Sequence, residues 1–210
     1  MTQSIDVTGI TVVGAGRASA PPDVVRIDLA AESSAKAVQA ALADATSGLA
    51  RMRETLTALG IQAVDLRTTE TSVHMDYGSS GRPQGYVARL GLSATVRDVG
   101  AAGAIVQDVL GSGGETARLS GLAFDHSDPS GLYVAAREAA VADARAKADQ
   151  YAALAGRTLG EVTAVDETGG GGPVPVPRRM AAAVPMADLS VDGGQQEISV
   201  TVVVRWAWGA

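Results

Sequence analysis

The order in which hydrophobic periods follow one another constrains the fold of this chain more than any other feature of its sequence. Residues 24–97 predict a strand, a long helix and two strands, because apolar side chains alternate, then recur every three or four residues, then alternate again. Residues 118–208 predict the same order, and a short helix over 98–112 joins the two stretches. The order predicts an α+β fold, in which two long helices and one short helix cover one face of a mostly antiparallel sheet.

The domain organisation follows from this order. We expect a single domain over residues 1–210, with possible halves at 24–97 and 118–208 that form a βαββ pseudo-duplication. The residues themselves do not repeat, so the duplication is a hypothesis about topology alone. Residues 168–195 contain four consecutive glycines and several prolines, which predicts a mobile loop inside the second half.

The two long helices are predicted to bury different faces. The first spans about residues 34–59, and Ser33 or Ser34 can cap it. The second spans about 128–155 and begins with an aspartate cap followed by proline. Its buried stripe is nearly all methyl groups, so this helix can lie very close to a sheet or another helix. The stripe consists of Tyr133, Ala136, Ala140, Ala144, Ala148, Tyr151 and Ala155.

Alternating apolar residues predict the strands. Residues 5–13 form a first strand, which ends in a turn at Gly14-Ala15-Gly16. Residues 63–77 and 86–96 form an antiparallel hairpin, and residues 198–208 form the last strand. Because only 3 % of the residues are aromatic, the core must be filled by alanine, valine, leucine and isoleucine.

Composition excludes several classes of function. Lysine and arginine are outnumbered 17 to 23 by acidic residues and lie scattered, which argues against nucleic-acid binding. The chain has no cysteine, so thiol chemistry and disulfides are excluded, and no apolar run is long enough to span a membrane. The first residues lack the pattern of a secretory leader, so we expect a cytoplasmic protein. A periplasmic or secreted protein whose leader was removed is the alternative.

The Gly14-Ala15-Gly16 segment follows a predicted strand, as a dinucleotide-binding loop does. However, Ser19 stands where the third glycine belongs, and Pro21-Pro22 follows instead of a helix whose N-terminus could hold a pyrophosphate. We therefore predict a turn there and no cofactor.

His74 and His126 are the two histidines and the first candidates for catalysis or metal binding. A carboxylate could orient His74 as a general base, although a solvated strand face accounts for the same pattern. The residues that share its predicted face are Glu70, Ser72 and Asp76. Asp125-His126-Ser127-Asp128 offers possible metal ligands, although helix capping explains these residues too. A metal site would be favoured if both histidines met near carboxylates, which the sequence does not show. We therefore assign no catalytic, cofactor-binding or metal-binding residue.

Four residues are candidates for contact with a partner. Trp206 and Trp208 lie on the apolar face of the last strand, which predicts the core or a subunit interface. Arg178 and Arg179 lie in the proline-rich loop, where they could meet a partner or an anionic surface. On the second long helix, the 143–147 spacing of an aspartate and a lysine predicts an ion pair on the solvent side.

A series of short segments, in this order and spacing, resembles the SIMPL-domain family, named for a signalling molecule that associates with a mouse pelle-like kinase. The resemblance covers roughly residues 8–206 and rests on glycine, proline, alanine and apolar positions that determine a fold. The segments are Ile10–Gly16, Ala20–Asp23, Leu59–Ile61, Asp65–Thr69, Tyr77, Gly85-Tyr86, Gly121–Phe124, Glu138–Ala148, Leu154–Val162 and Ile198–Val204.

The resemblance implies a bacterial protein similar to periplasmic immunogenic and oxidative-stress-related proteins, with a tendency to form larger oligomers and no catalytic residues to transfer. Our first hypothesis is a non-enzymatic protein that acts through self-assembly or through an unknown protein partner, and the resemblance adds a role in stress. The first alternative is a small-molecule binding module with an apolar pocket between the alanine-rich helix and the sheet. The second is a hydrolase or metal-dependent enzyme that uses His74 or His126.

Overall fold

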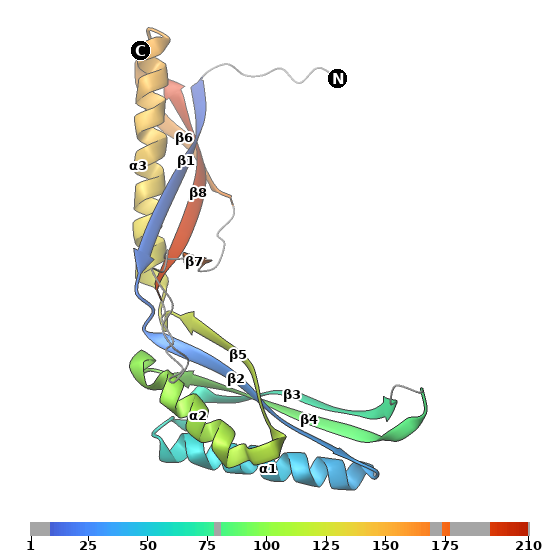
Figure 1. Cartoon of the computed structure of the whole chain (residues 1–210). Coiled ribbons are helices and arrows are strands. Elements are labelled where there is room, and N and C mark those ends of the chain that lie inside the picture. The colour runs from blue at the N-terminus through green and yellow to red at the C-terminus, as the bar shows by residue number, and fades with distance from the viewer. Residues whose placement is uncertain (1–8, 78–80, 169–173, 177–193, 210) are drawn as a thin grey trace, which may run out of the picture. The chain divides into compact units, whose positions relative to one another are not determined.

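The computed structural model describes residues 9–77, 81–168, 174–176 and 194–209, which fold into two compact units. Unit 1 holds the two ends of the described chain, and unit 2 holds the stretch between them (Figure 1). Unit 1 contains β1 (Gly9–Ala20), α3 (Ser130–Leu154), β6 (Leu159–Glu167), β7 (Val174–Val176) and β8 (Gln195–Trp208). Unit 2 contains β2 (Val24–Ala35), α1 (Val38–Ala58), β3 (Leu66–Tyr77), β4 (Pro83–Val96), α2 (Ala102–Gly113) and β5 (Ala117–Asp125).

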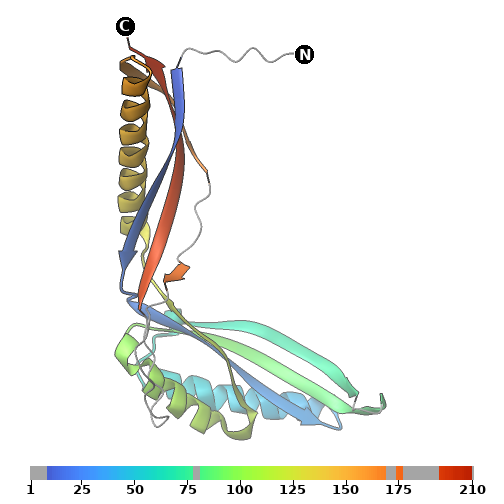
Figure 2. The same cartoon turned by 45° about the horizontal axis from the view of Figure 1, so that its top comes forward.

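Unit 2 is an antiparallel sheet with two helices on one face. Its strand order is β3-β4-β2-β5, and Figure 2 shows α1 and α2 together on the same side of this sheet. The predicted hairpin is confirmed, because β3 pairs with β4 from Leu66 opposite Ala94 to Tyr77 opposite Pro83. Ile27, Leu92 and Val109 are fully buried at the centre of the core between sheet and helices. The predicted α+β class is therefore confirmed, with the strands divided between two sheets.

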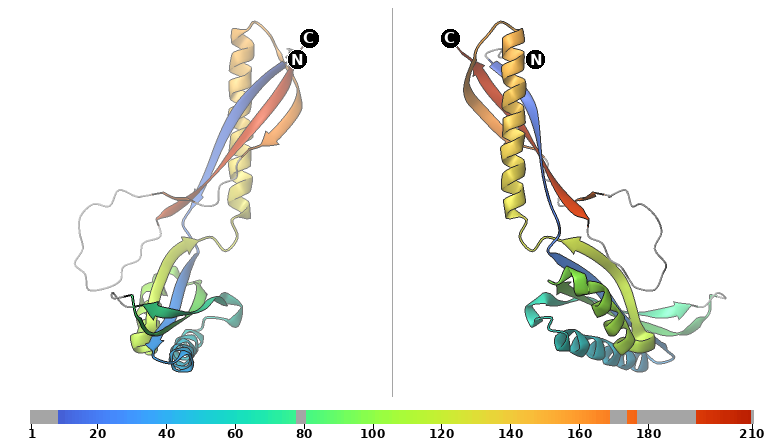
Figure 3. Two further views of the ribbon diagram at one scale, coloured as in Figure 1. Left: turned by 90° about the vertical axis from the view of Figure 1, so that its right-hand side faces the viewer. Right: turned by 60° about the vertical axis from the view of Figure 1, so that its left-hand side comes forward.

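Unit 1 is a second antiparallel sheet, covered on one face by α3 (Figure 3). The strand order is β1-β8-β6, and β7 pairs with the first residues of β8. The alanine stripe of α3 is buried against apolar side chains of β8, so the predicted close packing of this helix on a sheet is confirmed. The buried alanines are Ala136, Ala140, Ala144, Ala148 and Ala152. Tyr151 and Ala155, which were expected in the stripe, are exposed.

The two units do not coincide with the expected halves 24–97 and 118–208. β1 precedes the first expected half, yet it pairs with β8 over its whole length. β5 opens the second expected half, yet it pairs with β2 and packs Leu122 and Phe124 against the core of unit 2. The first half therefore keeps its strands and gains β5, whereas the second half loses β5 and pairs with β1, which belongs to neither half. Of the expected loop 168–195, most lies outside the described residues.

The predicted turn at Gly14-Ala15-Gly16 is wrong, because β1 continues through it to Ala20. Both glycines are buried under α3. A Cβ atom at Gly14 would overlap the carbonyl oxygen of Ala140, and one at Gly16 would overlap that of Ala136. The glycines therefore allow the helix backbone to approach the strand closely, a role that depends on a segment more than a hundred residues away.

The helix ends are partly as predicted. Gly60 and Gly156 follow the two long helices with φ of 88° and 64°, the left-handed conformation that glycine tolerates. The proposed cap of α1 is wrong, because β2 extends to Ala35 and holds Ser33 and Ser34 in the strand. At α3, the N–H of Ser130 donates to the Asp128 carboxylate at 2.9 Å, but the N-cap residue is Pro129, so the helix begins one residue later than predicted.

Candidate functional site

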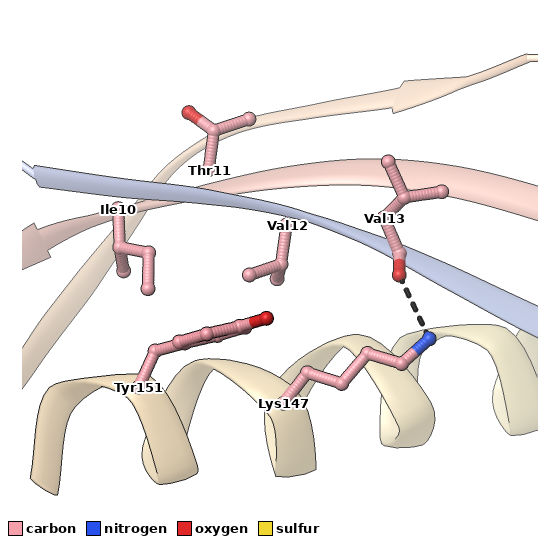
Figure 4. A pocket seen from close by; sticks show the side chains of 6 residues that line it. All are labelled: Ile10, Thr11, Val12, Val13, Lys147 and Tyr151. Carbon is pink, nitrogen blue, oxygen red and sulfur yellow. Dashed lines mark hydrogen bonds between the residues drawn. The ribbon is translucent and has the colours of Figure 1, made fainter. Parts of the chain in front are cut away.

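The β1 strand lies at the edge of the unit 1 sheet, beside α3. Side chains of its even-numbered residues, such as Val12, face the helix, and those of Thr11 and Val13 point away from it (Figure 4). In an edge strand, the backbone groups of every second residue point away from the neighbouring strand. The carbonyl of Val13 and the N–H of Ala15 are such groups, since both bind side chains of α3 instead of β8.

Asp143 and Lys147 of α3 hold these backbone groups. Lys147 Nζ lies 2.6 Å from Asp143 Oδ2 and donates to the Val13 carbonyl at 3.1 Å. The N–H of Ala15 donates to the same Asp143 oxygen at 2.8 Å. The hydrogen bond from Lys147, and then that from Ala15, hold the pKa of Asp143 below its ordinary value. The predicted ion pair is therefore present, but it also binds a strand, which its spacing did not reveal.

A shallow groove lies beside this pair, between β1 and the C-terminal half of α3. It has a volume of about 510 Å³, and the ring of Tyr151 extends from the helix toward Ile10 and Val12 (Figure 4). The groove lies at the margin of the helix–sheet interface, whereas the alanine stripe itself is closely packed on the strands. The apolar pocket expected between the alanine-rich helix and the sheet corresponds in place to this groove, and binding of a small molecule there stays a prediction.

In unit 2, the helices leave the edge strand β3 uncovered on their own side. Val73, Met75 and Tyr77 are 40 %, 36 % and 60 % exposed. Val73 and Met75 pair with Ala88 and Tyr86 of β4, which pack against α1, so they lie on the helix-bearing face. The α1 helix packs on β2 and β4, the two inner strands.

Two exposed residues of α1 extend this apolar surface. Leu42 and Arg51 are nine residues apart, so their side chains leave the helix about 180° from each other. Arg51 donates to backbone carbonyls at the end of α2, and Leu42 therefore lies on the flank toward β3. Val38 precedes Leu42 by one turn and shares its flank. Tyr77 follows a register shift at the end of β3, where it pairs with Pro83. We refer to Val38, Leu42, Val73 and Met75, together with Tyr77 at this strand end, as the β3 strip.

The opposite face of this sheet is polar and centred on Arg89. Its guanidinium donates to Glu32 at 3.0 Å, to Glu70 at 3.2 Å and to Ser120 at 2.7 Å, so one side chain joins all four strands. The hydrogen bond to Glu32 is the main reason why the pKa of Arg89 is raised. Glu70 also accepts a hydrogen bond from Ser72. Two of the three residues expected to share a face with His74 are thus bound in this network.

The two histidines lie at opposite corners of unit 2. His74 pairs with Val87, which pairs with Ser34 of β2. His126 follows β5, whose last residue pairs with Val24 at the other end of β2. Ten residues separate Ser34 from Val24, a distance of about 33 Å along the strand. The structure therefore does not bring the histidines together, and the described residues contain no cluster of three ligating side chains.

Asp23 and Ser127 bind each other where the chain enters and leaves unit 2. The sequence did not indicate this contact. The N–H and the hydroxyl of Ser127 donate to the Asp23 carboxylate at 2.7 and 2.6 Å. These bonds hold the pKa of Asp23 below its ordinary value. Ser127 is therefore a structural residue at the chain's exit from unit 2.

The four candidate interaction residues have different positions. Trp206 is 1 % exposed and lies within the core of unit 1, so its aromatic ring is not available to a partner. Trp208 is half-buried, and the guanidinium of Arg157 lies 5.7 Å from the centre of its ring. Arg178 and Arg179 lie outside the described residues.

Comparison with known proteins gives one family and two similar relatives. The model of the family described as SIMPL, protein of unknown function (DUF541), matches residues 10–206. The chain is similar to the 26 kDa periplasmic immunogenic proteins of Brucella melitensis and Brucella abortus. With each it shares 28 % identity over 209 residues, which covers 93 % of this chain and 82 % of the relative. Among the described residues, no helix combines the length and the apolar character needed to cross a bilayer.

Proposed function

Because this chain belongs to the SIMPL family, whose biochemical function is not established, we propose that it is a non-catalytic protein that acts by binding other protein chains, copies of itself among them. The observation that supports this proposal best is the β3 strip. It combines exposed apolar side chains with the backbone of an edge strand.

This combination favours a polypeptide as the ligand. An added strand can bind the outward backbone groups of β3 and cover Val73, Met75 and Tyr77 with its own side chains. A small apolar molecule could cover the side chains only. Exposed apolar patches of this kind mark interfaces in many proteins. A second copy of this chain offers the same surface, and two copies can pair through it symmetrically.

We also propose that the protein acts in the periplasm. The relatives from both Brucella species are named as periplasmic proteins. Fractionation of cells that express the full-length gene product tests this, with recovery in the osmotic-shock fraction as the expected result and recovery with the cytosol as the contradicting one. A role in oxidative stress stays an expectation of the resemblance, and no contact among the described residues bears on it.

Sedimentation velocity of three proteins tests the association. The wild type is expected to associate at tens of micromolar, and the triple variant Val73→Thr, Met75→Thr, Tyr77→Thr is expected to stay monomeric. Threonine keeps the β propensity of the strand and removes most of its apolar surface. The matched control is Val162→Thr, Val165→Thr, which changes two similarly exposed strand valines of unit 1 and should leave association as in the wild type.

Two results would contradict the proposal. A wild type that sediments as a strict monomer at these concentrations would remove self-association. Equal association of the triple variant and the wild type would remove the β3 strip as its site.

A second candidate function is small-molecule binding in the groove beside Tyr151, which the groove volume of about 510 Å³ favours. Titration with an apolar fluorescent probe tests it. Tyr151→Ala should weaken binding of the probe at least threefold if the groove is the site, and Leu154→Ala, an exposed residue of the same helix turn, should not. Equal binding by both variants would exclude the groove.

A further inference from the structure

Two helix side chains occupy the edge of β1, an arrangement that no other strand edge shows in the described part of the chain. We propose that the Asp143–Lys147 pair takes the place of a neighbouring strand at the centre of β1, and that it thereby excludes β1 from pairing with strands of other chains. The proposal concerns unit 1 and does not depend on the β3 strip.

The hydrogen bonds of the pair match those that a strand would make. Lys147 supplies a donor to the carbonyl of Val13, and Asp143 supplies an acceptor to the N–H of Ala15. These two backbone groups flank Gly14. In a parallel pair of strands, two backbone groups that flank a given residue bind the same residue of the neighbouring strand. They are the carbonyl of the preceding residue and the N–H of the following residue. The pair thus supplies the donor and the acceptor that this single residue would contribute.

The position of the pair decides how much of β1 remains open. The occupied segment 13–15 lies in the middle of β1 (Gly9–Ala20). On either side, only the four residues 9–12 or the five residues 16–20 stay continuous. Strands in globular proteins are typically about five to six residues long. An added strand of more than five residues would therefore have to cross the occupied segment and displace both side chains.

The close packing of α3 on β1 is what brings the pair within reach. Asp143 and Lys147 are one turn apart, so they share a flank of the helix. Gly14 lies against the helix backbone at Ala140 and Ala144, with no room for a Cβ atom. A Cβ atom at Gly14 would push the helix backbone away from the strand, and the carboxylate of Asp143 would move with it. The hydrogen bonds of Asp143 and Lys147 to β1 therefore depend on the close approach that the glycines allow.

Charge gives the pair a second effect on an approaching strand. Both side chains are roughly half exposed at the open edge, so an incoming backbone would have to remove water from an ammonium and a carboxylate. Desolvation of charged groups without new partners is costly. Charged side chains at a sheet edge are a known means of preventing edge-to-edge association.

A second charged pair on the same helix offers a matched control. Arg145 and Asp149 also stand four residues apart, with Arg145 Nε 3.0 Å from Asp149 Oδ2, and both are about half exposed. Both pairs contribute the same kind of helix-surface interaction. Only the Asp143–Lys147 pair has a hydrogen bond to β1 among the described residues.

The experiment compares Asp143→Ala, Lys147→Ala with Arg145→Ala, Asp149→Ala. Both double variants leave the net charge unchanged, and both carry the threonine substitutions of the β3 strip, so that association through unit 2 does not contribute. The readouts are amide hydrogen exchange at Ala15 and molar mass by light scattering over a range of concentrations.

We expect the Asp143/Lys147 variant to exchange the Ala15 amide at least tenfold faster at low concentration and to form dimers or larger species as concentration rises. The Arg145/Asp149 control should match the protein that carries only the threonine substitutions of the β3 strip, in both exchange rate and molar mass. Unchanged mass over the whole range would overturn the proposal, since the pair would then be a surface ion pair only. Association of the control to the same extent would also overturn it.

A third variant covers the case in which the alanine variant loses its fold. Asp143→Asn keeps an oxygen that can accept from Ala15 but removes the charge that binds Lys147. We expect an increase in exchange at Ala15 that is smaller than tenfold, together with weak, concentration-dependent association. Exchange and mass both equal to the background would overturn the proposal.

Discussion

Strands β1 and β3 both lie at the edge of their sheets, but they meet different neighbours. In unit 1, α3 packs directly on β1, and Asp143 and Lys147 bind its outward backbone groups. In unit 2, α1 packs on the two inner strands, and Val73, Met75 and Tyr77 of β3 stay exposed. The comparison teaches that the placement of a helix over a sheet decides which edge remains available for association.

The largest expected effect is a loss of unfolding free energy in unit 1 when α3 can no longer pack directly on β1. Gly16→Ala places a methyl group against the backbone of α3 at Ala136 and Ala140, so the helix has to move away from β1. We expect unit 1 to lose about 3 kcal/mol of unfolding free energy. Denaturant unfolding measures the loss. Gly131→Ala in the same helix meets open space and should change stability by less than about 1 kcal/mol. Equal effects of the two substitutions would contradict the role assigned to Gly16.

A lysine in the β3 strip would give β3 the charge that protects β1. Met75→Lys should weaken self-association at least tenfold, about 1.4 kcal/mol, because an ammonium would have to be buried on pairing. Its effect on folding should be small, since Met75 is already exposed. Sedimentation equilibrium measures the association constant. Met75→Leu is the control that keeps the apolar surface, and a lysine variant that associates like it would show that the strip is not an interface.

Low pH should reduce the exchange protection of the Ala15 amide in β1 without a matching reduction in β3. The pKa of Asp143 is lowered in the folded protein, so its stabilising contribution is complete above its ordinary pKa of about 4 and is lost as pH falls through the lower folded value. Below about pH 4, we expect exchange protection of the Ala15 amide, corrected for the intrinsic rate, to fall severalfold. Protection of amides in β3 should not follow this curve. Parallel loss in both strands would indicate general acid unfolding instead.

The smallest effect tests whether exposure alone determines association. Val165 of β6 is 57 % exposed, about as much as Tyr77 of the β3 strip. Val165→Thr should change the unfolding free energy by less than about 0.5 kcal/mol and leave the association constant unchanged. A variant that associates less than the wild type would show that unit 1 also contributes to the interface.

Much of the secondary structure could be predicted because it depends on neighbours in sequence. The period of the apolar residues indicated α3 with its alanine stripe. The threonine and valine content of 63–77 and the alternation over 86–96 indicated the β3–β4 hairpin. The pairings of β1 with β8 and of β5 with β2 were not predicted, because they join segments far apart in sequence whose patterns suit several partners.

The surfaces were harder to predict than the strands. Val73, Met75 and Tyr77 alternate with polar residues, but the strand contains so many threonines that a solvated strand was the simplest interpretation. The 143–147 spacing indicated an ion pair and could not indicate the backbone of β1, which lies far away in the sequence. The glycines at 14 and 16 have the same limitation, since a missing Cβ carries no information about what approaches it.

The hydrogen bonds between the two ends of unit 2 affect the order in which the chain can fold. Gly9 of β1 pairs with Ala207 of β8, so unit 1 forms only when nearly the whole chain is closed into a loop. The N–H of Asp23 donates to the carbonyl of Asp125 at 3.2 Å, so the two ends of unit 2 lie next to each other. Once unit 2 has folded, about half of the loop no longer contributes to the distance that must be closed. Unit 2 has the topology of an inserted module whose ends meet, and its early folding would lower the entropy cost of bringing the two ends of the chain together.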